Sequence, residues 1–216
     1  SRVARENVKV ALSADGGATW INDHMPVPKG MSMKNPAMDV DGRGNVHIVF
    51  TGSVRRPPKW SSSKPNRGYW QLRYIRRESS QWVDAQDALA TFSRWREPAD
   101  DSDMLSDWAD IAADQRGNLH LVWHGTVNTR IYGNDEAFYS SRSATAEGAW
   151  RSWSEPQALR PINAAKGEFF SFAPSLSVDD TGNLVVAVVF FDTTRAQANW
   201  RSNSRIILII FDYINS

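Results

Sequence analysis

The sequence contains no cysteine, so neither disulfide bonds nor thiolate chemistry can contribute, and the compartment stays open. It also has no excess of charge of either sign. The 25 Lys and Arg residues balance 24 Asp and Glu residues to a formal net charge of +1, which gives no global case for binding nucleic acid or an anionic membrane. Apolar runs are short, because the longest, near 184–191, and that at 206–211 have the length of buried strands. Neither approaches the roughly 18 residues of a membrane-spanning helix.

Tryptophan, in contrast, is abundant, with 10 residues in a chain of 216. This residue suits the interior of β-sheet proteins, and it equally suits platforms on which sugar rings stack. The sequence has no initiator methionine and no signal-like segment at its start. We therefore interpret Ser1 as the start of a trimmed or processed chain.

The stretch 13–20 has the chemistry of a tight β-hairpin. Residues 8–12 alternate between apolar and polar side chains, which is the period of a half-buried strand. Ser, Asp and two Gly follow; Asp accepts hydrogen bonds from nearby backbone N–H groups, and Gly adopts positive φ at low cost. Thr19 and Trp20 are good β-formers that begin the next strand. We expect Asp15 to accept backbone hydrogen bonds within its own turn, and Trp20 to plug the base of the hairpin.

The same stretch matches the pattern Ser/Thr-x-Asp-x-Gly-x-Thr-Trp through Ser13, Asp15, Gly17, Thr19 and Trp20. This pattern is the Asp-box, or BNR repeat, and the sequence resembles the sialidase-like β-propellers that carry it. In those proteins the Asp-box joins the third and fourth strands of a blade, away from the active site. The resemblance therefore implies a propeller fold and a structural role for these five residues.

A turn followed by an apolar strand occurs three times, at 41–50, at 114–123 and, more weakly, at 179–186. The copies share an Asp-x-x-Gly-Asn turn, and their glycines Gly44, Gly117 and Gly182 are 73 and 65 residues apart. Such a repeat indicates a stacked or propeller architecture. Short stretches at 36–40, 109–113 and 174–178 come before the three turns. We predict that each stretch is the first strand of a blade and that the apolar strand after the turn is the second.

Third strands are predicted at 71–77, 137–142 and 205–211, and fourth strands around Trp82 and around Trp150 and Trp153. The predicted fold is therefore all-β, a propeller unit over 1–216 with blades of four antiparallel strands. Residues 7–22 give half a blade, 35–95 and 108–158 give complete blades, and 173–213 give most of another. These three to three and a half blades form an incomplete ring, because closed propellers typically need four to eight. We expect missing blades of a longer chain or a second copy to close it, unless the N-terminal strands complete the last blade.

Strand order predicts which face carries function. In a four-stranded antiparallel blade, the turns between strands one and two and between strands three and four share one face. The minimal Asp-x-x-Gly-Asn turns and the Asp-box lie there. The opposite face receives the long connections: 23–34, 52–70, 96–108, 125–136, 159–172 and 192–204. Long loops on a rigid scaffold are where binding residues concentrate.

Arginine and aromatic residues in these connections suit an acidic sugar, because guanidinium groups pair with carboxylates and rings stack on sugar faces. The candidate substrate-binding residues are Arg56, Arg67, Trp70, Arg130, Arg195 and Trp200. A solvated loop packed by its own aromatics is the alternative reading. Four aspartates at 100–107 could bind Ca²⁺ or do acid–base work, but they lack the Gly and the closing Glu of an EF-hand loop. We predict no metal site and no cofactor.

His124 is the candidate general base, since a neutral His near a carboxylate can accept a proton. It is predicted to stand at the end of a second strand, with Thr51 and Asp192 as its counterparts in the other blades. Tyr132, Asp135 and Glu136 follow within the next connection and complete the candidate catalytic group. His47 and His120 occupy matching places inside repeated strands, which favours a role in blade packing.

The family resemblance implies an enzyme that binds a substrate carboxylate with three arginines and uses a Tyr nucleophile assisted by Glu, with an Asp acid–base. The Arg-Ile-Pro motif of that family is not present in this sequence, so those roles are not transferred to particular residues. We expect a carbohydrate-active protein for acidic glycans, a glycosidase or a polysaccharide lyase, and the resemblance favours an extracellular or periplasmic location. A lectin-like or protein-interaction propeller without turnover is the alternative, because propellers host both.

Overall fold

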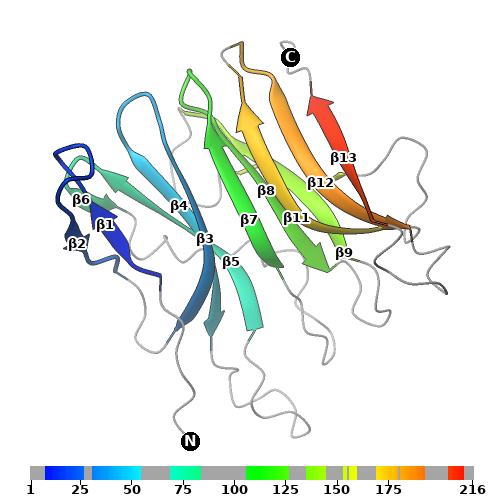
Figure 1. Cartoon of the computed structure of the whole chain (residues 1–216), viewed down its shortest axis with the longest axis horizontal. Coiled ribbons are helices and arrows are strands. Elements are labelled where there is room, and N and C mark those ends of the chain that lie inside the picture. Colours follow the sequence, from blue (N-terminus) through cyan, green and yellow to red (C-terminus); the bar gives the residue numbers. More distant parts are fainter. Residues whose placement is uncertain are drawn as a thin grey trace, which may run out of the picture.

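The computed structural model describes residues 8–26, 31–54, 69–83, 106–126, 135–144, 153–154, 156–159, 169–179, 181–192 and 204–211. Every regular element within these ranges is a β-strand, and the strands form four antiparallel sheets that lie side by side (Figure 1). The prediction of an all-β chain built from antiparallel blades is confirmed. No helix occurs in the described ranges, and so none there could cross a membrane.

Strand order follows chain order within each sheet, so each is a simple meander. A half blade consists of β1 (Val10–Leu12) and β2 (Ile21–Asp23). The first blade has β3 (Ser32–Val40), β4 (Val46–Val54), β5 (Tyr69–Glu78) and β6 (Gln81–Val83). The second has β7 (Ser106–Ala113), β8 (Leu119–Thr126), β9 (Asp135–Arg142) and β10 (Gln157–Leu159). The third has β11 (Phe169–Val178), β12 (Leu184–Asp192) and β13 (Ser204–Phe211).

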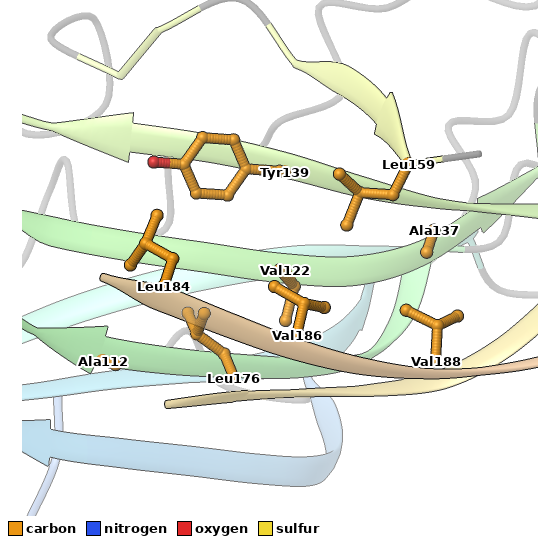
Figure 2. Packing of buried hydrophobic residues seen from close by; sticks show 9 residues of the cluster. All are labelled: Ala112, Val122, Ala137, Tyr139, Leu159, Leu176, Leu184, Val186 and Val188. Atoms are coloured by element: carbon orange, nitrogen blue, oxygen red, sulfur yellow. The ribbon is translucent and has the colours of Figure 1, made fainter. Parts of the chain in front are cut away.

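Apolar side chains fill the space between neighbouring sheets. Successive residues of β8 point to opposite faces of their sheet, and Leu121 and Val122 are both fully buried, so both faces of the second blade are covered. Leu121 packs with Val49 and Leu72 of the first blade. Val122 packs towards the third blade (Figure 2), with Leu176 of β11 and Val186 of β12. Strands buried on both faces read as continuous apolar runs, which is why the second strands were visible in the sequence.

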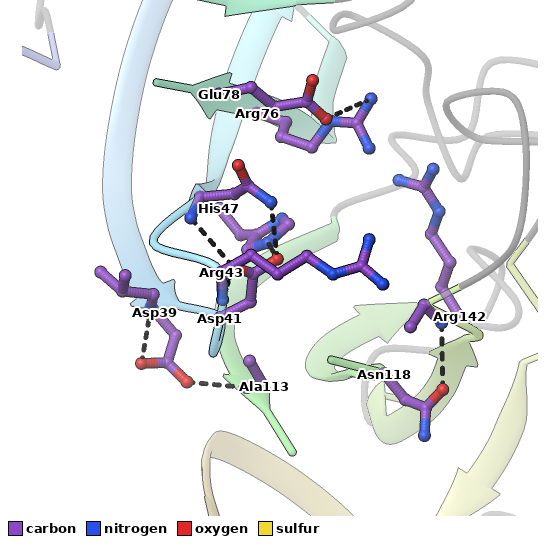
Figure 3. Close-up of polar contacts among 12 residues, drawn as sticks. Asp39, Asp41, Arg43, His47, Arg76, Glu78, Ala113, Asn118 and Arg142 are labelled. Atoms are coloured by element: carbon purple, nitrogen blue, oxygen red, sulfur yellow. Dashed lines mark hydrogen bonds and ion pairs between the residues drawn. The ribbon is translucent and has the colours of Figure 1, made fainter. Parts of the chain in front are cut away.

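The first strands of the blades, β3, β7 and β11, lie next to one another and are joined by aspartate side chains. The Asp39 carboxylate accepts a hydrogen bond from the backbone N–H of Ala113 in β7 at 2.7 Å (Figure 3). One blade further, Asp110 accepts hydrogen bonds from the Leu176 N–H at 2.8 Å and from the Ser175 hydroxyl at 3.0 Å. We call β3, β7 and β11 the inner strands. These bonds hold them in nearly the same register.

The ring is not closed within the described residues, and one repeated position makes this visible. Met38, Ile111 and Leu176 each lie six residues before the glycine of their turn. Ile111 and Leu176 are 3% and 8% exposed because the preceding blade covers them, whereas Met38 is 56% exposed. In the part of the chain that the structure describes, the half blade before Met38 consists of β1 and β2, and these two strands leave this part of the first blade uncovered.

The hairpin of the Asp-box forms the bonds expected of its sequence. The Asp15 carboxylate accepts hydrogen bonds from the Thr19 backbone N–H at 2.9 Å and from the Thr19 hydroxyl at 2.6 Å. The Ser13 hydroxyl donates to Asp15 at 2.7 Å and accepts from the Gly17 N–H at 2.7 Å. Positive φ occurs at Gly16 and Gly17, which suits glycine. The expected position of Trp20 is wrong: its ring is 64% exposed, and its indole N–H donates to the Gly17 carbonyl. It covers its own turn and does not plug the base of the hairpin.

Asp15→Ala is expected to lower the melting temperature of the protein without changing its affinity for a glycan. The carboxylate holds the turn together, and the turn lies at the edge of the sheets where the Asp-x-x-Gly-Asn turns also lie (Figure 1). Thermal unfolding followed by circular dichroism gives the first quantity, and calorimetric titration gives the second. Loss of glycan binding at an unchanged melting temperature would contradict a structural role.

Candidate functional site

The three Asp-x-x-Gly-Asn turns tie one edge of the sheets with the same set of bonds. In each turn the aspartate accepts hydrogen bonds from the backbone N–H and side-chain amide of the asparagine four residues later, at 2.7–2.9 Å. The aspartate carbonyl also accepts from the glycine N–H. Gly44, Gly117 and Gly182 have φ of 81°, 79° and 90°, a conformation that L side chains rarely adopt. The turns predicted from the repeat are present in all three blades.

A buried polar chain leads from the first of these turns into the blade. His47 Nε2 lies 3.2 Å from the Asp41 carboxylate, and His47 Nδ1 lies 2.8 Å from the Tyr74 hydroxyl. A carboxylate can only accept, so Nε2 carries the proton in the neutral ring and Nδ1 accepts from Tyr74. The Tyr74 oxygen in turn accepts a hydrogen bond from Arg142 of the second blade at 3.3 Å. The chain therefore runs Arg142, Tyr74, His47, Asp41 and joins two blades.

The second blade repeats the arrangement. His120 Nδ1 lies 2.9 Å from the Tyr139 hydroxyl, and Nε2 lies 3.7 Å from the Asp114 carboxylate, which is an ion-pair distance but longer than a hydrogen bond. In the third blade Val185 stands at the position of the histidine. Leu208, which pairs across the ladder with Ala187, stands at the position of the tyrosine. Histidine and tyrosine thus occur together in two blades and are replaced together in the third.

An Asp–His–Tyr chain could in principle activate the tyrosine as a base, but its burial favours a structural role. His47 and Tyr74 are 3% and 2% exposed, and His120 and Tyr139 are 2% and 9% exposed. Burial lowers the pKa of both histidines below the ordinary value of 6.5, although the neighbouring aspartates oppose this. The rings are therefore neutral at physiological pH. The prediction that His47 and His120 pack the blades agrees with this geometry.

Acid is expected to destabilise the protein in two stages. Because the pKa of His47 and His120 is lowered on folding, their stabilising contribution is lost as pH falls below 6.5. Hydrogen bonds from Thr19 and Thr181 lower the pKa of Asp15 and Asp179 to about 2. Burial would raise the pKa of Asp41, but hydrogen bonds from Asn45, His47 and Arg43 bring it to about 2. The stability that these carboxylates provide is lost as pH falls from 3.8 towards 2. Melting temperatures at roughly pH 7, 5 and 3 test this, and a constant value would refute it.

The opposite edge of the sheets is marked by a β-bulge in each inner strand. The ladders shift register between Lys34 and Ala37, between Asp107 and Asp110, and between Phe172 and Ser175. One residue in each bulge has positive φ without being glycine: Asn35 at 48°, Trp108 at 51° and Ala173 at 44°. Each of the three lies nine residues before the glycine of its turn. The inner strands are in nearly the same register, so the three bulges lie at one level.

The bulges correct the predicted starts of the inner strands. Pro36 and Pro174 were expected to begin their strands, but β3 and β11 begin at Ser32 and Phe169 and continue through the bulge. Proline lacks the N–H that a ladder needs, and a bulge is one of the few places where a sheet accepts it. Left-handed backbone at Trp108 and Ala173 costs on the order of 1–3 kcal/mol each, and such strain concentrates at functional sites. Three equivalent strained positions therefore identify this edge as the candidate site.

Trp108 is the residue of this site that the sequence did not select. Its side chain is 43% exposed, whereas Ala109 and Ile111 after it pack in the core. It was one tryptophan among ten, and nothing in the sequence indicated that it would sit in a bulge at positive φ.

His124 lies beside the same bulge. It is paired across the ladders with Asp107 in β7 and with Ala137 in β9, and its side chain is 6% exposed. Its counterparts by register are Thr51, paired with Lys34, and Val189, paired with Phe172, so the expected counterpart Asp192 was wrong by three residues. In the third blade the apolar run continues past Val189 to Phe191, so the end of the run does not mark the counterpart of His124. A catalytic role for His124 stays a prediction.

The other predicted residues are only partly within the described structure. Asp135 and Glu136 belong to β9 and not to the preceding connection, and Trp70 belongs to β5; only the backbone of these residues is described. The remaining candidates lie outside the described residues: Arg56, Arg67, Arg130, Tyr132, Arg195 and Trp200. Within the described ranges no group of three or more His, Cys, Asp or Glu residues could hold a metal ion.

No protein-family model and no curated protein match the sequence. Among solved structures, the chain is similar to an endo-arabinase from Bacteroides thetaiotaomicron VPI-5482, with a TM-score of 0.48 and 14% identity over 90% of this chain and 61% of that one. It is also similar to an ulvan lyase of a new polysaccharide lyase family, bound to -[GlcA(1-4)Rha3S]-, with a TM-score of 0.50 and 15% identity over 90% of this chain and 44% of that one. The chain spans less than two thirds of the length of either structure. At 15% identity the similarity to the ulvan lyase shows the fold alone, and neither structure shows a sialidase or BNR-repeat family.

Proposed function

We propose that this chain is the substrate-binding part of a carbohydrate-active propeller that binds acidic glycans at the edge where the three bulges lie, and that it acts there as a glycosidase. The observation that carries the proposal is the strained, left-handed residue at the same position of all three inner strands. Bulges that re-aim side chains are common beside active sites. They occur here at the ends of the sheets from which the long, arginine- and tryptophan-bearing connections leave.

Acidic glycans are favoured by two further observations. The candidate residues Arg56, Arg67 and Arg130 carry guanidinium groups, which pair with carboxylates or sulfates in a bidentate manner. In addition, the ulvan lyase with the same fold was solved with a sugar that contains glucuronic acid. A lyase removes a proton beside the uronate carboxylate, and a hydrolase adds water across the glycosidic bond, so His124 could serve as the base in either reaction.

Binding and product analysis on one set of glycans tests the proposal. The protein is incubated with sialyllactose, polygalacturonate fragments and hyaluronan oligosaccharides, and with neutral cello-oligosaccharides as the control. Hydrolysis releases reducing ends alone, a lyase also produces an ultraviolet-absorbing unsaturated sugar, and a lectin-like protein binds without either product. We expect binding of an acidic sugar with new reducing ends, and slower turnover in His124→Ala. Equal binding of neutral sugars, or no binding at all, would contradict the proposal.

A further inference from the structure

We infer that Trp108 is the sugar-stacking platform of this site and that its strained backbone is retained because the ligand needs the indole ring in that place. This inference rests on the proposed function and adds the residue on which an acidic pyranose ring would lie. Trp108 combines three properties: a left-handed backbone, a partly exposed large ring and a place at the level of the bulges on the inner strands. No other described residue combines them.

Comparison of the three bulges supports this reading. The same backbone conformation is occupied by Asn35, Trp108 and Ala173. Asparagine is among the residues that adopt left-handed conformations most readily, and alanine presents little more than its Cβ. Tryptophan gains nothing from this backbone and is bulky, so a simple turn would not select it. The large ring is therefore explained by what it contacts and not by the conformation that it adopts.

The surroundings of Trp108 fix its backbone and leave the ring partly in solvent. Ala109 packs in the core between the first two blades, and Asp110 is bonded to Leu176 and Ser175 of β11. On the other side, Asp107 is held in the ladder opposite His124. The residues around Trp108 thus hold its backbone from both sides. A backbone held in this way limits the conformations open to the indole ring, so less entropy is lost when a sugar stacks on it.

The chemistry of the site suits a pyranose with one charged substituent. The C–H face of a sugar ring packs on the indole, because aromatic rings contribute a large apolar surface with a negatively polarised face. Lys34 comes directly before the bulge of the neighbouring inner strand β3. It occupies the same position there that Asp107, the residue before Trp108, occupies in β7. A cation at this level of β3 provides an attraction for the carboxylate of the stacked sugar or of its neighbour.

Two kinds of substitution at Trp108 separate binding from strain. Trp108→Ala and Trp108→Gly both remove the ring, and each is expected to weaken the affinity for the acidic oligosaccharide about tenfold, whereas Trp108→Phe retains most of it. Glycine accepts the left-handed conformation without strain, so Trp108→Gly should have a higher melting temperature than Trp108→Ala. Calorimetric titration with a polygalacturonate fragment or a hyaluronan oligosaccharide gives the affinities, and thermal unfolding gives the stabilities.

Two matched variants serve as controls. Trp20→Ala removes a ring that is 64% exposed, but this ring lies on the Asp-box hairpin, so affinity should not change. Ala173→Gly relieves the same strain in the third blade without removing a ring, so it serves as the control for stability and should raise the melting temperature. If acidic glycans bind but Trp108→Ala binds as well as the wild type, the platform assignment is wrong and the proposed function stands. If no acidic glycan binds, both fail. If Trp108→Gly melts at a lower temperature than Trp108→Ala, the backbone at position 108 is not strained and that part of the inference is wrong.

Discussion

Tyr74→Ala is expected to lower the free energy of unfolding by about 3–5 kcal/mol, the cost of removing a large aromatic side chain from a packed core. Tyr74 is 2% exposed and lies between the first and second blades. Its ring stacks on His47 and meets Trp153 edge-on at 5.6 Å, and its hydroxyl contacts His47 and Arg142. Chemical denaturation of both proteins measures the change, with the slope compared to confirm that both unfold alike.

Tyr74→Phe separates the packing of the ring from its hydrogen bonds. This variant keeps the ring but removes the donor for His47 Nδ1 and the acceptor for Arg142, which should cost about 1–3 kcal/mol. Met38→Ala is the control at the surface of the protein. Because Met38 is 56% exposed, this substitution should change the free energy of unfolding by less than about 0.5 kcal/mol. A loss in Tyr74→Ala no larger than that of Met38→Ala would show that the two blades are not packed through Tyr74.

Features built from neighbouring residues were predictable from the sequence. The turn at Asp41 is formed by hydrogen bonds to Arg43 and Asn45, so its chemistry lies within five residues of the chain. The same holds for the Asp-box hairpin, where Asp15 bonds to Thr19. Blades followed from these turns because apolar strands after them pair with the nearest strands, and each sheet keeps the order of the chain.

Features that depend on the register between strands or on the surrounding structure were not predictable. Proline at 36 and 174 indicated the start of a strand. Each strand in fact begins before its proline and pairs on both sides of the bulge, because a left-handed residue absorbs the register shift. Propensity gives no reason to place Trp108 in that conformation. Trp20 was expected to plug the base of its hairpin, yet only β1 and β2 of the half blade are described beside it and the residue is mostly exposed.

The sequence selected both an edge of the sheets and individual residues for the candidate site, and most of these residues lie outside the described structure. Chain direction alone placed the long connections at the edge opposite the Asp-x-x-Gly-Asn turns, because successive connections between antiparallel strands lie at alternate edges of a sheet. Choosing residues within those connections needed contacts that are not local. His124 was chosen from its place at a strand end, and the register places it beside the bulge that contains Trp108. The sequence drew attention to His124 but did not connect it to Trp108.

Asp41→Ala is expected to cost about 2–4 kcal/mol, because one carboxylate holds several donors at once. The side chain is 8% exposed, and it accepts hydrogen bonds from the Arg43 N–H, from both nitrogens of Asn45 and from His47. Without it, His47 Nε2 is left in a buried place without this acceptor. Asp179→Ala is the matched variant: it removes the same turn bonds from an exposed aspartate in the blade where Val185 replaces the histidine. Its effect should be smaller.

A double-mutant cycle identifies the part of the Asp41 effect that passes through the histidine. His47→Val introduces into the first blade the residue that the third blade uses at the same position. In this background Asp41→Ala no longer leaves an imidazole donor unpaired, so its cost should fall towards that of Asp179→Ala, with a coupling energy of about 1–2 kcal/mol. Denaturant unfolding of the four variants gives the cycle. If Asp41→Ala costs the same with valine as with histidine at position 47, the aspartate stabilises only its own turn, and the buried chain from Asp41 to Arg142 does not act as a unit.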